Sequence, residues 1–204
     1  MAAKTSYHHG NLRQSLIDGA IDLIGETGFD QLSLRQVARR VGVSHNAPYR
    51  HFADKEALLA AVSEEGFQAL QAALKFAQQG ISADSPQRLQ ALGRAYVEFA
   101  LTNPAHYRVM FGQYRCDLSQ YPDLEKASEQ AFRVLVDTIV DGQAAGIFRA
   151  ADPLDMARVA WALVHGQSML ALDHKFQIEP GKDFESFLQF SSQILFEGLG
   201  AGRC

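Results

Sequence analysis

The sequence of 204 residues predicts an all-α fold, with an N-terminal three-helix domain and a larger C-terminal helical bundle, about nine helices in all. Apolar residues recur at spacings of three and four along most of the chain, as they do on one face of a helix. Helix-capping residues, Gly and Pro separate these stretches. The sequence contains no strand-like alternation and no internal repeat. We place the domain boundary after residue 54, which gives domains 1–54 and 55–204.

Composition narrows the class of protein further. An apolar content of 47% is normal for a globular protein with a packed core. No apolar run approaches the roughly 18 residues that a membrane span needs, and the N-terminal stretch lacks the apolar segment of a signal peptide. The two cysteines, Cys116 and Cys204, are too few for a disulfide framework. We therefore expect a cytoplasmic protein without a membrane segment.

The first predicted helix begins after Asn11, a capping residue, and ends at Gly28. Its apolar residues share one face, which we expect to be buried against the next two helices. Such packing would hold short helices that are unstable in isolation. The predicted buried face comprises Leu16, Ile17, Ala20, Ile21, Leu23 and Ile24.

Residues 33–52 predict two short helices joined by a sharp turn. Ser33 with Gln36 forms a capping-box pattern, and Gly42 stands where a helix end needs positive φ. Ser44 then caps a second short helix over about 45–51. A helix, a Gly-containing turn and a second helix form the helix-turn-helix of DNA-binding proteins. The alternative is an ordinary helical hairpin with a solvated polar face.

The polar residues of this segment suit contacts with nucleic acid. Arginine, histidine, asparagine and tyrosine supply donors for phosphates and base edges. The formal net charge is −4. However, residues 1–60 carry seven Lys and Arg against six Asp and Glu, whereas residues 61–204 carry twelve against seventeen. Positive charge is therefore concentrated near the predicted DNA-binding face.

Residues 12–62 resemble the N-terminal domain of the TetR/AcrR transcriptional regulators. The matching segments, in order, are Glu26-Thr27-Gly28-Phe29, Ser33-Leu34-Arg35-Gln36-Val37-Ala38, Val41-Gly42-Val43-Ser44, Tyr49-Arg50-His51-Phe52 and Asp54-Lys55-Glu56-Ala57-Leu58-Leu59. Ala47 and Pro48 depart from the family, which often has a hydroxyl residue and then an aliphatic one here. Direct base contacts would then depend more on His45 and Asn46.

The resemblance also implies a phosphate contact for Lys55, which lies in the first turn of a fourth helix, 55–79, capped by Asp54. The positive end of a helix dipole favours an anion at that position. The alternative is a solvated surface lysine. The predicted DNA-binding residues are Ser33, Arg35, Arg39, Ser44, His45, Asn46, Tyr49, Arg50, His51 and Lys55.

The C-terminal half predicts five more helices. Ser85-Pro86, Asn103-Pro104, Asp152-Pro153 and Asp183 are typical of helix starts and breaks. The predicted ranges are 86–102, 104–111, 122–146, 154–172 and 184–197.

This half is rich in aromatic residues, and the spaces between helices of a bundle often hold ligands. The segment Trp161 to Gly166, with His165, resembles the WHG-type ligand-binding domain of one TetR branch, which implies effector binding and dimerisation. The candidates are mostly neutral, so we expect an apolar or weakly polar effector. For most of them a plain core role is the alternative. The effector-pocket candidates are Tyr96, Phe99, Tyr107, Met110, Phe111, Tyr114, Trp161, His165 and Met169.

Helices 154–172 and 184–197 are the predicted dimer contacts. Small residues in the first of them would let a partner helix approach closely, and the second is apolar on more than one face. Two-fold pairing would present two recognition segments to successive major grooves about 34 Å apart, on a palindromic operator. The alternative is that the last helix only closes its own bundle.

Together these patterns predict a DNA-binding regulator, most simply a repressor that a small molecule releases from its operator. A helical-bundle enzyme is the first alternative, but His165, Asp155 and Asp173 do not have the spacing of a catalytic or metal motif. A protein-binding adaptor is the second. We expect no cofactor, and no metal at His8-His9, because no partner lies at ligand spacing.

Overall fold

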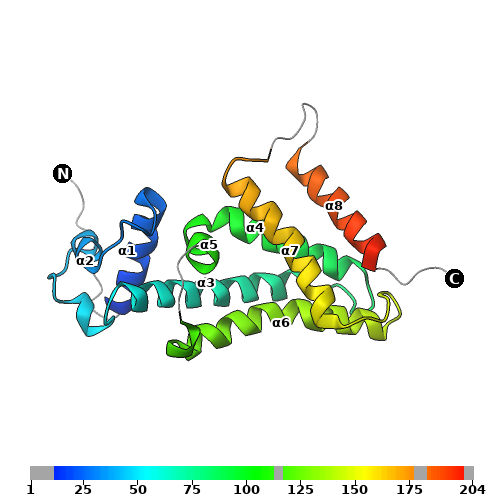
Figure 1. Ribbon diagram of the computed structural model, residues 1–204, viewed down its shortest axis with the longest axis horizontal. Coiled ribbons are helices and arrows are strands. Elements are labelled where there is room, and N and C mark those ends of the chain that lie inside the picture. Colours follow the sequence, from blue (N-terminus) through cyan, green and yellow to red (C-terminus); the bar gives the residue numbers. More distant parts are fainter. Residues whose placement is uncertain (1–11, 113–116, 177–182, 200–204) are drawn as a thin grey trace. The chain divides into compact units, whose positions relative to one another are not determined.

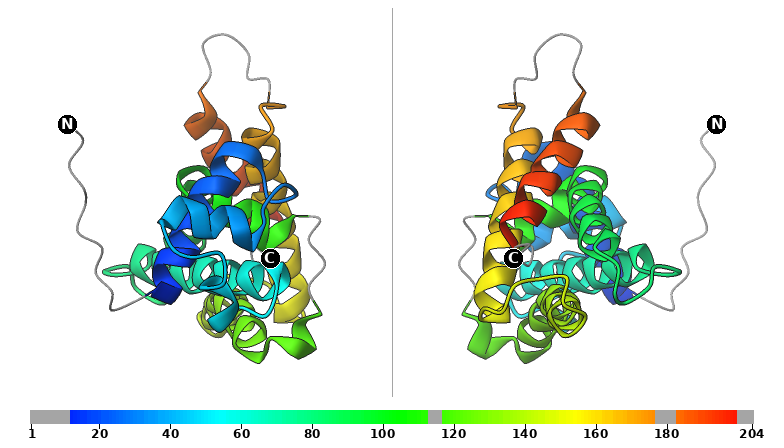
Figure 2. Two further views of the ribbon diagram at one scale, coloured as in Figure 1. Left: turned by 90° about the vertical axis from the view of Figure 1, so that its left-hand side faces the viewer. Right: turned by 90° about the vertical axis from the view of Figure 1, so that its right-hand side faces the viewer.

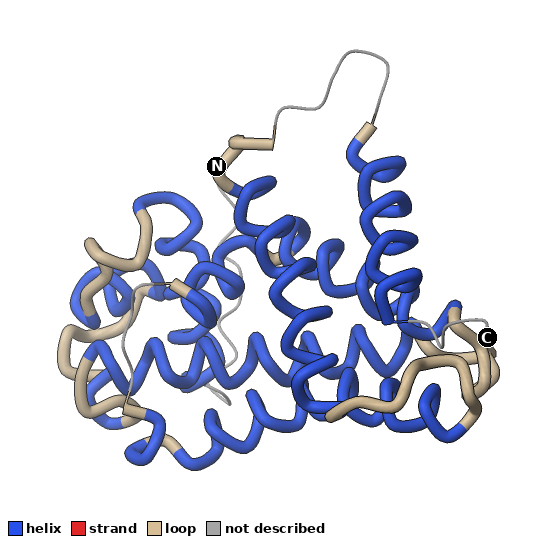
Figure 3. Tube along the Cα trace, turned by 45° about the vertical axis from the view of Figure 1, so that its right-hand side comes forward, coloured by secondary structure: helices blue, strands red, loops and turns tan. Residues whose placement is uncertain are grey.

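The computed structural model describes residues 12–112, 117–176 and 183–199. Within these ranges the chain is helical and contains no strand, as the sequence predicts (Figure 3). The described α-helices are α1 (Leu12–Thr27), α2 (Leu34–Val41), α3 (Lys55–Ala77), α4 (Gln87–Thr102), α5 (Pro104–Phe111), α6 (Pro122–Ala144), α7 (Pro153–Leu172) and α8 (Phe184–Leu199) (Figure 1). Two 3₁₀ helices, η1 (Pro48–Arg50) and η2 (Leu118–Gln120), complete them.

The structure corrects the second helix of the helix-turn-helix. Residues 45–51 do not form an α-helix; they form turns and the single 3₁₀ turn η1, so the described residues hold eight α-helices rather than about nine. Pro48 has no N–H and therefore cannot donate to the carbonyl of Ser44, as an α-helix requires. Within residues 44–51 the backbone bonds span three residues instead, with Ala47 N to Ser44 O at 2.9 Å and Arg50 N to Ala47 O at 3.2 Å.

The chain divides into two compact units. The first contains the described part of residues 1–66 and 105–124, and the second contains the described part of 67–104 and 125–204. This division differs from a boundary at residue 54, because residues of the first half of α3 and Val109 of α5 share a core with α1 and α2. Whether function divides at residue 54 remains a prediction.

The first unit is held together by one apolar core. Gly19 allows α1 to approach α2 closely, since a Cβ there would lie only 2.6 Å from Cγ2 of Val41. Helix α5 contributes Val109, which is 2% exposed, although it is distant in sequence from the other members. The principal core residues are Leu16, Ile17, Ala20, Leu34, Val37, Phe52, Leu58, Leu59 and Val62.

Local contacts fix both ends of α2. Ser33 caps its start by accepting from the backbone N–H of Gln36 at 3.3 Å. Gly42 ends it in the left-handed conformation, with φ of 77°. Arg40 forms a two-pronged ion pair with Glu26 of α1, with Nη1 to Oε1 at 2.8 Å, and this hydrogen bond lowers the pKa of the Glu26 carboxyl. The orientation of α2 relative to α1 is thus set by packing and by charge.

The second unit is built from α4, α6, α7, α8 and the C-terminal part of α3. α7 and α8 lie next to each other (Figure 2), and Gln167 of α7 donates to the hydroxyl of Ser191 in α8 at 2.6 Å. Arg88 of α4 pairs with Asp141 of α6 at 3.1 Å. Among the described residues, no helix is long and apolar enough to cross a membrane.

We predict that Gly42→Ala destabilises the protein by about 1–2 kcal/mol, because an L-residue is strained at a φ of 77°. Gly25→Ala is the matched control: Gly25 lies within α1 with open space around it, so the change should stabilise by up to about 1 kcal/mol. Urea denaturation followed by circular dichroism measures both free energies of unfolding. Equal shifts in the two variants would contradict the left-handed helix end.

Candidate nucleic-acid interface and ligand cavity

The segment after α2 is anchored at two points and exposed between them. Pro48 is fully buried and Phe52 is 3% exposed, and Phe52 belongs to the core of the first unit. At the start of the segment, Val43 N donates to the carbonyl of Ala38 at 2.9 Å, which completes the helix end at Gly42. The three residues between the anchors, Tyr49, Arg50 and His51, therefore face solvent.

Most of the predicted DNA-binding residues lie on the surface of α2 and this segment. Tyr49 is 50% exposed, which is unusual for a large aromatic residue without a partner to cover it. Ser33 and Lys55 are only partly exposed. The exposed residues are Arg35, Arg39, Ser44, His45, Asn46, Tyr49, Arg50 and His51.

The arginines of this region divide into paired and unpaired groups. Arg40 is occupied by Glu26 and so has a structural role. By contrast, Arg35, Arg39 and Arg50 form no ion pair with any acidic residue in the described part of the chain. Their charges are available to a phosphate backbone.

Ser33 and Lys55 already have partners within the protein. The hydroxyl of Ser33 donates to Oε1 of Gln36 at 2.8 Å, in addition to capping α2. Nζ of Lys55 donates to the carbonyl of Asp30 at 2.9 Å and so ties the start of α3 to the α1–α2 loop. An ammonium group carries three protons, so this bond leaves Lys55 able to bind a phosphate as well.

Sequence reasoning missed Arg13 at this site. Its guanidinium lies 5.6 Å from the centroid of the Phe52 ring, a cation–π contact between α1 and the end of the exposed segment. No local pattern could have indicated it, because the two residues are far apart in the chain.

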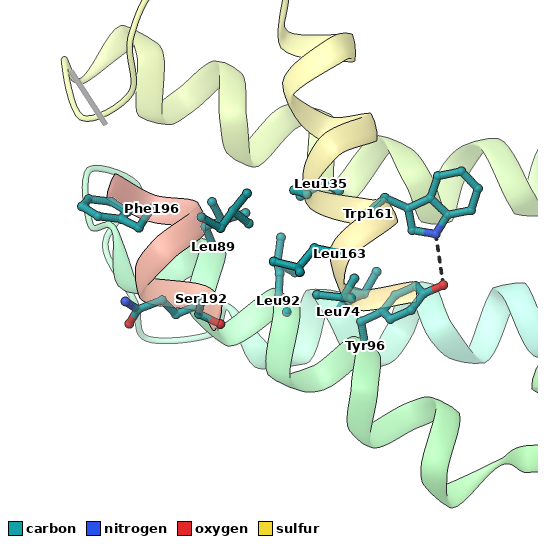
Figure 4. A pocket seen from close by; sticks show the side chains of 14 residues that line it. Leu74, Leu89, Leu92, Tyr96, Leu135, Trp161, Leu163, Ser192 and Phe196 are labelled. Atoms are coloured by element: carbon teal, nitrogen blue, oxygen red, sulfur yellow. Dashed lines mark hydrogen bonds between the residues drawn. The ribbon is translucent and has the colours of Figure 1, made fainter. Parts of the chain in front are cut away.

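The second unit contains a small cavity among α3, α4, α6, α7 and α8, with a volume of about 50 Å³ (Figure 4). Of the predicted pocket residues, Tyr96 and Trp161 line it. Most of the remaining wall is hydrocarbon. The aliphatic and aromatic residues that complete it include Leu74, Leu89, Leu92, Leu135, Leu163, Val164, Leu195 and Phe196.

Three polar side chains are joined beside this cavity. Nε1 of Trp161 donates to the hydroxyl of Tyr96 at 3.0 Å (Figure 4), and that hydroxyl lies 3.1 Å from Nδ1 of His165. Burial lowers the pKa of His165 below its ordinary value, so the ring is neutral at pH 7. A neutral ring can accept at Nδ1 while the Tyr96 hydroxyl donates, which gives each group a partner. The node links α4 to α7.

The other pocket candidates do not line this cavity. Phe99 is buried and Met169 is half-buried in the second unit. Tyr107 is fully buried in the first unit, with its ring 4.8 Å from that of Phe111, and Met110 also belongs there. Tyr114 and the pair His8-His9 lie outside the described residues. The leucines that do form the wall were missed, since a leucine at a cavity and one in a packed core have the same helical spacing.

The candidates for catalysis are not brought together. Asp155 pairs with Arg158 at 2.8 Å, and the backbone N–H of Asp173 ends α7, whereas His165 contacts Tyr96. The described residues contain no group of three or more His, Cys, Asp or Glu that could hold a metal ion.

Curated relatives match parts of this chain, among them a BetI regulator and a tetracycline repressor protein. The transcriptional regulator BetI of Serratia proteamaculans is 31% identical over 118 residues, which is 57% of this chain and 59% of BetI. The class D tetracycline repressor protein of Escherichia coli is 42% identical over 53 residues, 26% of this chain and 24% of the repressor. The chain thus spans less than two thirds of the length of these relatives.

Solved structures match over nearly the whole chain. A protein of unknown function from Rhodococcus sp. RHA1 is 34% identical with a TM-score of 0.84, covering 97% of this chain and 100% of the other. A tetR-family regulatory protein from Rhodococcus RHA1 is 24% identical with a TM-score of 0.74, covering 94% and 98%, which shows a shared fold.

Two family models cover most of the sequence between them. Residues 16–62 match the model described as bacterial regulatory proteins, tetR family. Residues 89–191, half of the chain, match the model described as tetracyclin repressor-like, C-terminal domain. The first match lies within the first unit, and the second covers most of the second unit together with α5, most of which belongs to the first. These matches show that the chain belongs to the TetR family of bacterial regulatory proteins.

Proposed function

We propose that this chain is a sequence-specific DNA-binding transcriptional regulator, a repressor that leaves its operator when a small molecule binds the second unit. The observation that carries the proposal is the exposed segment between Pro48 and Phe52, together with the unpaired arginines Arg35, Arg39 and Arg50. In this role the arginines bind phosphates, and His45 and Asn46 contact base edges. Such a regulator acts on chromosomal DNA, so the proposal places it in the cytoplasm and assigns it no catalytic role.

The proposed homodimer forms through α7 and α8. Their outer surface carries large apolar side chains that are more than half exposed: Val159 at 57%, Phe190 at 60% and Ile194 at 53%. They border a groove of about 480 Å³ between the two helices. Apolar surface of this kind favours a partner, and a second copy related by two-fold symmetry also gives the paired recognition segments that a palindromic operator needs.

Release would follow from a population shift. The cavity of about 50 Å³ is far below the roughly 300–1,000 Å³ of ordinary ligand sites, so an effector must favour a conformer in which it is wider. Helix α4 lines the cavity through Leu92 and Tyr96 and continues across Asn103 into α5, which contributes to the core of the first unit. A displacement of α4 would therefore be transmitted to α5 through Asn103. Coupling of about 1–3 kcal/mol is the expected scale.

We expect Tyr49→Ala to weaken binding to the operator about tenfold without unfolding the protein, because Tyr49 is exposed and outside the core. The operator is obtained by selecting random duplexes with the wild-type protein, and gel-shift titration gives the affinity. Tyr49→Phe is the control that removes only the hydroxyl. Wild-type affinity in Tyr49→Ala, or failure to select any duplex, would refute the proposed DNA-binding face.

Lys55→Ala should reduce the slope of log K against log salt by about one unit, because one phosphate contact is lost. Lys75→Ala is the matched control, since Lys75 lies in the last turn of the same helix and should leave the slope unchanged. Gel shifts at several salt concentrations measure both slopes. An unaltered slope in Lys55→Ala would leave Lys55 only its bond to the carbonyl of Asp30.

Ile194→Glu should convert the dimer to monomers, since it would bury a carboxylate in the apolar interface. DNA affinity should fall with it, because one half-site is lost. Gln193→Glu introduces the same charge at the neighbouring exposed position of α8 and should remain dimeric. Sedimentation velocity measures the oligomeric state. A dimeric Ile194→Glu variant would show that α8 is not at the interface.

A further inference from the structure

We propose that the effector is an amphiphile with a hydrocarbon part and an uncharged polar head, and that it binds between α4 and α8. The inference deepens the proposed function, since it assumes that the second unit binds a small molecule, and it names the chemical class and the opening. Four features of the second unit carry it: a polar cleft, an apolar cavity, the contact between the two, and one ion pair at the cleft.

The cleft lies between α4 and α8 and has a volume of about 430 Å³, which is within the range of ordinary ligand sites. It shares Gln90, Gly93, Val164 and Ser192 with the apolar cavity. The cleft and the cavity therefore adjoin at these four residues. A single elongated molecule can occupy the cleft and extend into the cavity when the cavity widens.

The inner end suits hydrocarbon. Leu74, Leu92 and Leu135 lie around the cavity in Figure 4, with Phe196 at one side. The polar atoms of the Tyr96 and Trp161 side chains are bonded to each other, so they do not require a polar ligand group. Transfer of an alkyl or aryl group from water into this space is favourable.

The outer end suits a polar group without charge. Gln87, Gln90 and Gln189 line the cleft with amides, each of which can donate and accept. The charged residues in its lining are Arg94 of α4 and Glu185 of α8, which form an ion pair with each other. Their charges cancel, so an ionic head would be desolvated without a free counter-charge.

This ion pair therefore makes the cleft selective for an uncharged head over a charged one. Both side chains are more than half exposed, at 63% and 55%, so the pair contributes little to stability and one partner can be replaced without loss of the fold. Removing Glu185 would leave Arg94 without its partner from α8 at the mouth of the cleft. The same site would then accept an anionic head.

Trp161 is the single tryptophan of the chain and lines the cavity, so its fluorescence reports on ligand binding there. Octanamide, octanoate and octylammonium share a chain length and differ in head charge. We expect octanamide to change the emission of Trp161 saturably, and the two ions to bind about tenfold more weakly because their heads lack a counter-charge. No saturable response to octanamide, or equal or tighter binding of either ion, would overturn the proposal.

Three variants test the geometry. Glu185→Gln should raise the affinity for octanoate relative to that for octanamide about tenfold, because it removes the acidic partner of Arg94. Ser192→Phe fills the junction of cleft and cavity and should abolish octanamide binding, whereas Gln193→Phe, at the next and exposed position, should retain it. Glu185→Gln lies on the surface, so it remains informative even if Ser192→Phe does not fold. An unchanged ratio of these two affinities in Glu185→Gln would overturn the role of the ion pair.

These titrations use the full chain without DNA, so they are independent of the operator. Octanamide binding by a protein that selects no duplex would overturn the proposed function and leave this inference standing. Duplex binding without any octanamide response would overturn this inference and leave the regulator intact.

Discussion

The burial of Pro48 and Phe52 is the constraint on which the first unit depends. These two residues anchor a segment too short and too irregular to hold itself, because η1 is a single 3₁₀ turn rather than a helix. Between the anchors, the side chains of residues 49–51 are exposed to solvent. The core beneath, built from α1, α2, α3 and α5, therefore determines the position of Tyr49 through these two anchors.

The helices of the second unit surround a cavity. This cavity is too small for a ligand of ordinary size, and a hydrogen-bonded node of Tyr96, Trp161 and His165 braces α4 against α7 beside it. A cavity that a ligand must widen is a natural place for a switch, since close-packed helices move between discrete arrangements. In the proposed release, the covalent connection from α4 to α5 would carry that movement into the first unit.

Arginine has separate roles in this chain, and its partners distinguish them. Arg40 is bound to Glu26 and links α2 to α1, while Arg94 is bound to Glu185 and neutralises the α4–α8 cleft. Arg39, next to Arg40 in sequence, has no acidic partner among the described residues and faces solvent. One position along a helix changes the face by about 100°, so neighbouring residues of the same type can serve structure and binding separately.

The sequence by itself determined most of the α-helices and the family. Capping residues such as Ser33, Asp152 and Asp183 bond to backbone groups two or three residues away. The helix starts that they stabilise can therefore be predicted from the local sequence. The missing backbone N–H of Pro48 is evident from the sequence, but the 3₁₀ turn that it favours was not predicted. Only the tertiary structure decided that α5 joins the first core, that leucines form the cavity wall, and which arginines are paired. Those outcomes depend on contacts between residues far apart in the chain, and helical periodicity specifies which side of a helix is apolar without specifying what that side meets.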